Sequence, residues 1–227
     1  MSQEKRFKSR GTSVDAIFQH LYDEIVNLTL LPGKKISEAE IANRFGVSRQ
    51  PVRDAFSRLE GMDLLLIRPQ KATQVKRFSI REVSKSRFVR ATVEAEVLRR
   101  AAANCDAAGA ARLDKCLSDQ SRVVDDGEYH AFGALDYAFH KTLCEIAGVD
   151  YAFEVISAEK RKVDRLCMLG LAKEDRMPEL LEDHIEMAKH VKNGAPELAV
   201  EVGMAHLARL DDTIVSISTR HADYFDP

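Results

Sequence analysis

The spacing of apolar residues changes once along this 227-residue chain, near residue 78. Before that point, Ile17, Leu21, Ile25 and Leu28 have helical spacing and predict an amphipathic helix that ends at Leu31-Pro32-Gly33. Residues 64–68 and 73–77 predict two strands joined by a turn at residues 69–72. After residue 79 the apolar spacing is helical throughout, so the predicted fold is mainly α.

Residues 41–60 hold two short helical segments that meet at Gly46. Glycine suits this turn because it adopts a positive φ without strain. Ser48 is expected to cap the second segment, and Pro51 falls in its first turn, where a missing N–H costs little. The second segment has an apolar stripe of Val52, Phe56 and Leu59.

Two arginines lie near the start of this second helix, off its apolar stripe. Arg49 and Arg53 are four residues apart, and arginine can donate two hydrogen bonds to guanine in the major groove. Three helices followed by a hairpin form a winged helix–turn–helix, so we expect these arginines to read bases. The alternative is an ordinary helix–turn–helix pair with solvated arginines. Supporting DNA contacts are expected from Arg44, Ser48 and Gln50, and from Lys71 and Thr73 on the wing.

The order of these residues resembles the GntR family of bacterial transcription regulators. The matching residues are Leu31-Pro-Gly33, Ser37-Glu38, Ile41-Ala42, Phe45-Gly-Val-Ser-Arg49, Pro51-Val-Arg-Asp54 and Arg58-Leu-Glu60. The resemblance covers residues 13–77 and implies a DNA-binding domain. It departs from the family at the wing tip, where glycine is frequent and this chain has Gln70-Lys71.

Charge is unevenly distributed, although the net charge is only −2. Residues 1–78 carry a net charge of +5 and the remainder −7, which is typical of a nucleic-acid-binding module joined to a domain with another role. Residues 1–12 are expected to be a disordered basic tail. The four cysteines show no Cys-x-x-Cys pair, so they are expected to be reduced core residues of a cytoplasmic protein. No apolar run is long enough to span a bilayer, and no membrane partner is expected.

The second half is predicted to be an antiparallel helical bundle with no flexible linker before it. Ser79 and Glu82 form a capping box at its start, and Pro178 and Pro196 are expected to begin the last two helices. The predicted helices span residues 79–104, 107–126, 128–147, 150–172, 178–193 and 195–219. The predicted organisation is a tail (1–12), a winged helix–turn–helix (13–77), a helical effector-binding and dimerisation domain (78–220) and a second tail (221–227).

Candidate metal ligands lie in three of these helices. Asp136 and His140 are four residues apart and therefore share a face, while His184 and His206 lie beside apolar stripes of the last two helices. Three imidazoles and one carboxylate suit Zn, Ni, Mn or Fe. The alternative, which stays open at this point, is that each histidine is a satisfied core residue.

These four residues follow the order of the FCD effector domain in the FadR branch of the GntR family. The resemblance covers residues 79–219 and includes Arg90 and Glu94 in the first bundle helix and His206-Leu207 in the last. It implies a divalent metal ion that binds a small carboxylate effector, with Arg90 as a further effector ligand. The alternative for Arg90 is a helical ion pair with Glu94. One departure is Gly148-Val-Asp150, where the family commonly has Gly-Asn.

The resulting interpretation is a metabolite-responsive transcriptional repressor, not an enzyme, that binds a palindromic double-stranded DNA operator as a homodimer. A competing interpretation is a metal-dependent enzyme that acts on a small carboxylate, since open metal positions also serve catalysis. No His-Glu-x-x-His motif, nucleophile elbow or glycine-rich phosphate loop supports that interpretation. A third is an architectural DNA-binding protein whose helical half only dimerises.

Overall fold

The computed structural model describes residues 13–167 and 173–226, which form two compact units. The N-terminal unit contains the chain up to Phe78 together with the segment from His221 onward, and the helical bundle contains Ser79–Arg220. The expected basic tail, residues 1–12, lies outside the described residues. None of the described helices is long and apolar enough to cross a membrane.

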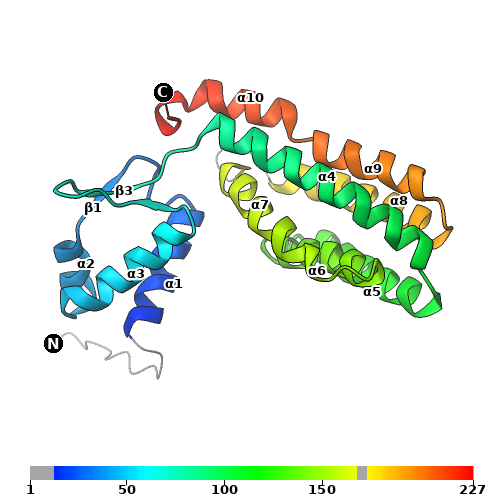
Figure 1. Ribbon diagram of the computed structural model, residues 1–227, viewed down its shortest axis with the longest axis horizontal. Helices are drawn as coiled ribbons and strands as arrows, with labels where there is room; N and C mark the ends of the chain where they lie inside the picture. Colours follow the sequence, from blue (N-terminus) through cyan, green and yellow to red (C-terminus); the bar gives the residue numbers. More distant parts are fainter. Residues whose placement is uncertain (1–12, 168–172, 227) are drawn as a thin grey trace. The chain divides into compact units, whose positions relative to one another are not determined.

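Three helices and a small sheet make up the N-terminal unit (Figure 1). They are α1 (Ser13–Val26), α2 (Glu38–Phe45) and α3 (Arg49–Gly61), with β1 (Lys35–Ile36), β2 (Leu65–Leu66) and β3 (Thr73–Val75). Ser37 caps α2 by accepting a hydrogen bond from the Glu40 N–H, and Gly46 ends it with φ at 65°. Their apolar faces form one core that includes Ile17, Leu21, Ile25, Ile41, Val52, Phe56, Leu59 and Leu65.

The winged helix–turn–helix is confirmed, with one more strand than the sequence predicted. The sheet has the antiparallel order β1-β3-β2, and β1 is the unpredicted strand. A strand of two residues is too short to show the alternation of apolar and polar positions by which a strand is recognised in a sequence. At the wing tip, Gln70 adopts φ 59°, the left-handed conformation that glycine favours. The backbone there therefore takes a glycine-like turn although glycine is absent.

The described part of the bundle is entirely helical (Figure 1). Its helices are α4 (Ile80–Asn104), α5 (Ala107–Asp125), α6 (Tyr129–Ile146), α7 (Ala152–Cys167), α8 (Lys173–Lys192), α9 (Pro196–Ala208) and α10 (Asp211–Arg220). Ser79 caps α4 by accepting from the Glu82 N–H over 3.4 Å. Because α4 contacts α6, α7, α8 and α9, its buried residues join one core that includes Val97, Leu98, Ala101, Phe139, Leu143, Ile156, Met187 and Ala199.

Two helices of the bundle differ from their predicted extents. Helix α8 begins at Lys173, so Pro178 lies inside it and not at its start. A proline this near the beginning removes one helical hydrogen bond, which the packed helix tolerates. The last predicted helix is divided into α9 and α10 at Arg209-Leu210. No glycine or proline marks that break, and the local signal is the acidic pair Asp211-Asp212 directly after it, which is typical of the first turn of a new helix.

The segment that follows α10 packs against Phe78 in the N-terminal unit. Residues Ala222–Tyr224 form a 3-10 helix, and the buried ring of Phe225 lies 5.6 Å from that of Phe78. The Phe78 N–H donates to the Tyr224 carbonyl over 2.9 Å, and the Asp226 N–H donates to the Phe78 carbonyl over 2.7 Å. Residues 221–226 are thus packed where the sequence predicted a tail.

Candidate nucleic-acid interface and candidate metal centre

The first turn of α3 presents polar side chains away from the core of its unit. The apolar stripe of α3 is buried, whereas Arg49, Gln50 and Arg53 are exposed. Ser48 occupies the N-cap position, as expected, but its side chain accepts no capping hydrogen bond. Its exposed hydroxyl is therefore available to another group, such as a phosphate.

Acidic neighbours bind two of the arginines that are predicted to contact DNA. Arg53 Nε lies 3.0 Å and 2.9 Å from the two Glu38 carboxylate oxygens. Arg44 binds both Glu24 oxygens through its terminal nitrogens, at 2.9 Å and 2.6 Å. Arg49 has no ion-pair partner among the residues that the structure describes. Exposed ion pairs are weak, so DNA can compete for Arg53, and Arg49 is already available.

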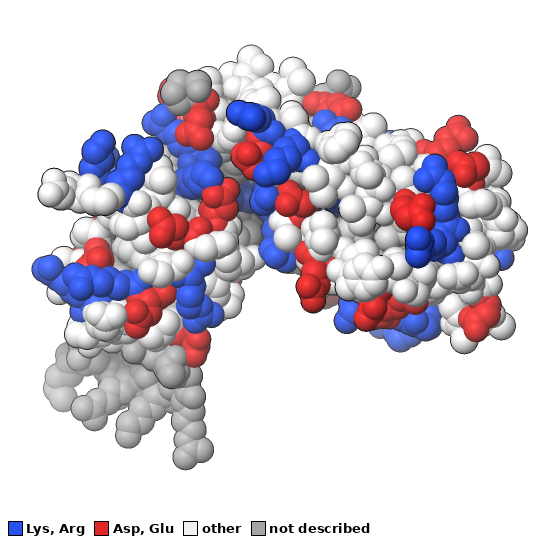
Figure 2. Space-filling view, viewed as in Figure 1, with Lys and Arg blue, Asp and Glu red and all other residues white. Residues whose placement is uncertain are grey.

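The wing supplies two further predicted contacts. Lys71 is exposed at the tip and Thr73 is half-buried at the start of β3. Figure 2 shows Lys and Arg side chains over the wing and over the α2–α3 region of the N-terminal unit, with acidic side chains between them. The predicted contacts therefore belong to one winged helix–turn–helix with a mixed, locally basic surface.

The four candidate metal ligands come together inside the bundle. Asp136 and His140 project from α6, His184 from the middle of α8 and His206 from the last turn of α9, and all are buried. One ligand atom from each lies within 4.8 Å of all the others. Asp136 Oδ1 is 3.4 Å from His184 Nε2 and 3.8 Å from His140 Nε2. The structure therefore unites residues that the sequence placed on three separate helices.

Each imidazole is held by a partner on its Nδ1 side. The partner oxygens are Glu94 Oε2 at 3.0 Å from His140, Gln120 Oε1 at 2.8 Å from His184, and Asp183 Oδ2 at 3.2 Å from His206. Such outer partners fix the ring orientation of metal-binding histidines and favour a proton on Nδ1. That tautomer leaves the Nε2 lone pair for a metal.

The Gln120 amide shows how one tautomer is determined. Its Nε2 donates to the Leu135 carbonyl over 3.1 Å, so its Oε1 faces His184 and can only accept a hydrogen bond. The proton of His184 is therefore on Nδ1. The Phe139 ring stacks on the same imidazole with 4.3 Å between ring centres, and this contact helps to hold its plane.

Several buried polar atoms within the cluster have no hydrogen-bond partner among the described residues. They include Nε2 of His140, Nε2 of His184 and Oδ2 of Asp136. Lys160 Nζ lies 2.9 Å from that Asp136 oxygen and forms an ion pair with it, so the two imidazole Nε2 atoms are the groups of the cluster left without a close polar partner among the described residues. Unsatisfied buried polar atoms are rare in proteins, and imidazoles with a carboxylate suit a first-row divalent ion. The residues therefore fit a metal ion.

Burial gives these ligands the protonation states that a metal requires. It lowers the pKa of His184 and of His206, so both imidazoles are neutral near pH 7. Burial also raises the pKa of the Asp136 carboxyl, but the Lys160 ammonium outweighs it and lowers that pKa overall. The carboxylate is therefore ionised.

Arg90 is connected to the cluster through Glu94. Its Nε donates to Glu94 Oε1 over 2.8 Å, while the other Glu94 oxygen lies beside His140. Burial works against ionisation of Glu94, but His140 and Arg90 lower its pKa to about 2. The helical ion pair that the sequence left open is therefore present, and a role for Arg90 in effector binding stays a prediction.

Three neighbours of the cluster were not singled out from the sequence: Gln120, Lys160 and Asp183. Asp183 also accepts two bonds from Arg209, at 2.6 Å and 2.8 Å. It directly precedes His184, but adjacent residues on a helix face different directions, so adjacency carried no information. Gln120 on α5 and Lys160 on α7 have no spacing relation to the ligands, and the sequence offers no signal for them.

Comparison with known proteins identifies both parts of the chain. Residues 13–75 match the family described as bacterial regulatory proteins, gntR family, and residues 87–209 match the FCD domain. The chain belongs to the GntR family. This GntR-family chain is 30% identical over 209 residues to the HTH-type transcriptional repressor RspR of Escherichia coli K12, and the match covers 92% of each chain.

Solved structures have the same fold as this GntR-family chain. A GntR transcriptional regulator from Rhodococcus sp. RHA1 matches with a TM-score of 0.70 at 18% identity, over 91% of this chain and 99% of that one. McbR/YncC of E. coli matches with a TM-score of 0.67 at 16% identity, over 89% and 97% of the two chains. The protein is a DNA-binding transcription regulator of the GntR type with an FCD domain.

Proposed function

We propose that this GntR-family protein is a repressor that responds to a small organic acid through a divalent metal ion. Asp136, His140, His184 and His206 hold the metal in this proposal. The observation that carries it is the convergence of these four buried ligand groups within 4.8 Å in the FCD domain. The Nδ1 partners support it, because they leave the Nε2 atoms for a metal.

The charge of the ligands favours an anionic effector. Neutral imidazoles and one carboxylate carry −1 together, so a divalent ion brings the set to +1. A bound metal supplies a positive charge and open coordination positions that attract a carboxylate. Arg90, buried and next to Glu94, is proposed as a further effector ligand because its guanidinium can bind a carboxylate with two parallel bonds.

On DNA, we propose that Arg49 and Arg53 read bases in the major groove. Their exposure at the start of α3 supports this role. A homodimer is proposed because one winged helix–turn–helix reads few base pairs, and two-fold pairing on a palindrome doubles the contacts. Further contacts to bases or phosphates are assigned to Arg44, Ser48 and Gln50, and to Lys71 and Thr73 on the wing.

Elemental analysis of protein purified without a histidine tag or chelator tests the metal site. About one Zn, Ni, Mn or Fe ion per chain is expected. His140→Ala should lower the metal content, the melting temperature and the response of DNA binding to small carboxylates together. His190→Ala is the matched control, because His190 lies on α8 near the exposed Glu186, outside the cluster.

Some outcomes would contradict this proposal. One such outcome is a substoichiometric metal content that added Zn, Ni or Mn does not restore, in protein that still responds to carboxylates. The four residues would then be part of the packed core and not metal ligands. Turnover of a carboxylate by the metal-loaded protein, without an effect on DNA binding, would favour a metal-dependent enzyme.

A further inference from the structure

The largely buried ammonium of Lys160, on α7, lies between two carboxylates. Its Nζ is 2.9 Å from Asp136 Oδ2, and 2.9 Å and 3.2 Å from the two oxygens of Asp164. The side chains of Lys160 and Asp136 are only 13% and 7% exposed. The Tyr137 hydroxyl donates to Asp164 Oδ2 over 2.8 Å and so holds the second carboxylate in place. Two close carboxylates favour the charged form of the lysine.

The two oxygens of Asp136 have different surroundings. Oδ1 lies beside the candidate ligand nitrogens, 3.4 Å from His184 Nε2 and 3.8 Å from His140 Nε2. Oδ2 forms the ion pair with Lys160. A carboxylate can bind a metal ion through one oxygen or through both. Because Lys160 holds Oδ2, Asp136 has one oxygen left for a metal.

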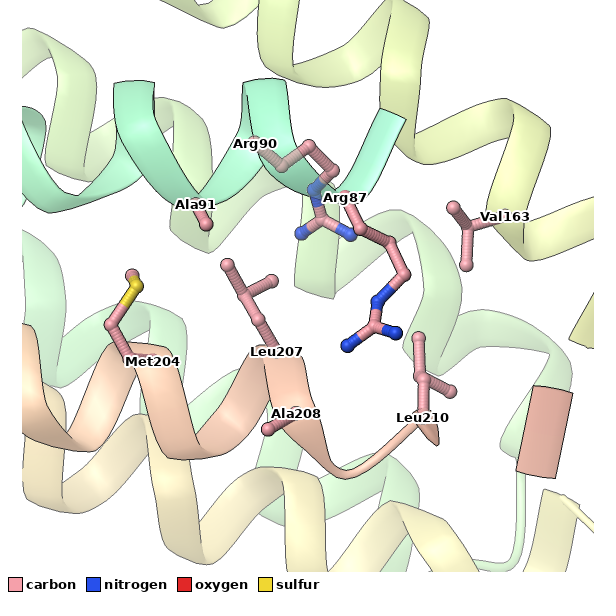
Figure 3. Close-up of a pocket in the computed structure, with 8 residues that line it drawn as sticks. All are labelled: Arg87, Arg90, Ala91, Val163, Met204, Leu207, Ala208 and Leu210. Atoms are coloured by element: carbon pink, nitrogen blue, oxygen red, sulfur yellow. The ribbon is translucent and has the colours of Figure 1, made fainter. Parts of the chain in front are cut away.

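Arg90, a second buried cation of the bundle, is engaged elsewhere. Its Nε donates to Glu94 over 2.8 Å. A cavity of about 100 Å³ is lined by Arg87 and Arg90 of α4 and by Leu207 of α9, and Figure 3 shows the Arg90 guanidinium extending from α4 toward it. Lys160 is therefore the cation that contacts Asp136 directly.

We propose that Lys160 is a positioning residue of the metal centre, with two effects on Asp136. It restricts Asp136 to binding the metal through one oxygen, and it balances the charge of this buried carboxylate in the metal-free protein. The inference rests on the proposed function and names a residue that regulates its metal site. An ammonium beside a divalent ion repels it, so Lys160 also weakens metal binding. The metal then binds reversibly to a bundle that is already folded.

Zinc affinities of full-length variants, measured by chelator competition, test this role. Lys160→Met removes the charge at similar length and should bind zinc about tenfold more tightly than the wild type. Asp164→Asn leaves the ammonium to Asp136 alone and should bind zinc roughly threefold more weakly. Lys160→Arg keeps the charge, so its zinc affinity should stay close to that of the wild type.

Two further measurements separate positioning from a general loss of structure. Metal-free Lys160→Met should melt at a lower temperature than the wild type, because Asp136 is left without its counter-charge, and zinc should raise its melting temperature more. Visible absorption of bound cobalt, which weakens as the coordination number rises, should be weaker in Lys160→Met because Oδ2 is released. A purely structural role would instead lower stability and zinc affinity together.

The matched control is Lys162→Met, because Lys162 lies on the same helix and pairs with Glu159, outside the cluster. It should leave zinc affinity and the cobalt spectrum unchanged. Zinc binding by Lys160→Met that is equal to or weaker than that of the wild type would overturn the inference and leave the proposed metal site intact.

If metal-free Lys160→Met does not fold, Asp164→Asn decides: weaker zinc binding supports the inference, and unchanged affinity overturns it. Absence of zinc binding by the wild type would contradict the proposed function, and this inference with it.

Discussion

Replacing Gln120 by leucine removes one outer partner of the metal cluster and leaves its four ligands in place. Gln120 is fully buried, accepts from His184 Nδ1 over 2.8 Å and donates to the Leu135 carbonyl over 3.1 Å. Leucine has a similar size and no polar atoms. The substitution therefore removes the hydrogen bond to His184 and keeps the packing around Gln120.

Gln120→Leu should change two quantities, the stability of the metal-free protein and the affinity for the metal. Without metal, the buried Nδ1–H of His184 loses its acceptor, which costs about 1–3 kcal/mol of unfolding free energy. With metal, loss of an outer partner typically lowers affinity by roughly 10- to 100-fold, which corresponds to about 1.4–2.7 kcal/mol. The stability gained on adding zinc should therefore be smaller in the variant than in the wild type.

Urea unfolding with and without zinc, combined with a chelator competition for zinc affinity, measures both quantities. Gln74→Leu is the matched control, because Gln74 donates one side-chain bond to the Gly33 carbonyl in the N-terminal unit. It should lower the stability of that unit and leave zinc affinity unchanged. Unchanged zinc affinity in Gln120→Leu, beside a measured loss of stability without metal, would refute the assignment of His184 as an oriented ligand.

Other predictions concern the two units separately. Arg53→Ala should weaken binding to an in-vitro-selected operator roughly 5- to 100-fold and relax the base preference at one position of each half-site. The control is Arg58→Ala, because Arg58 lies on the same helix but pairs with Asp15. Fluorescence anisotropy measures the operator affinity of both variants. The metal-free protein should lose stability as the pH falls below 6.5, the ordinary pKa of histidine. Below that pH, His184 and His206 take up protons in the unfolded chain but stay neutral in the folded protein, where their pKa values are lowered, so protonation favours unfolding. The slope should reach about 1.4 kcal/mol per pH unit for each histidine, and a flat urea-unfolding profile between pH 7.5 and 5.5 would contradict it. Phe225→Ala should destabilise the N-terminal unit by about 3 kcal/mol, because it removes a buried ring that contacts Phe78. Calorimetry of the wild type and the variant measures the change in melting temperature. An unchanged transition would show that residues 221–226 do not stabilise that unit.

The sequence by itself determined most of the helices and the two-part organisation. Helical spacing of apolar residues, the Ser37 and Ser79 caps and the turn at Gly46 act within about four residues, so a local pattern records them. For the same reason Asp136 and His140, one helical turn apart, were visible as a pair. Residue order and family resemblance then added His184 and His206 as candidates for the same site.

Only the tertiary structure decided how these groups meet. It supplied Glu94, Gln120 and Asp183 on the Nδ1 sides of the imidazoles, formed the cavity beside Arg87 and Arg90, and placed Phe225 against Phe78. Each contact joins residues that are distant in the sequence, and each depends on how helices or chain segments pack together. Periodicity records which face of a helix is buried, but it does not record which side chain of another helix lies opposite that face.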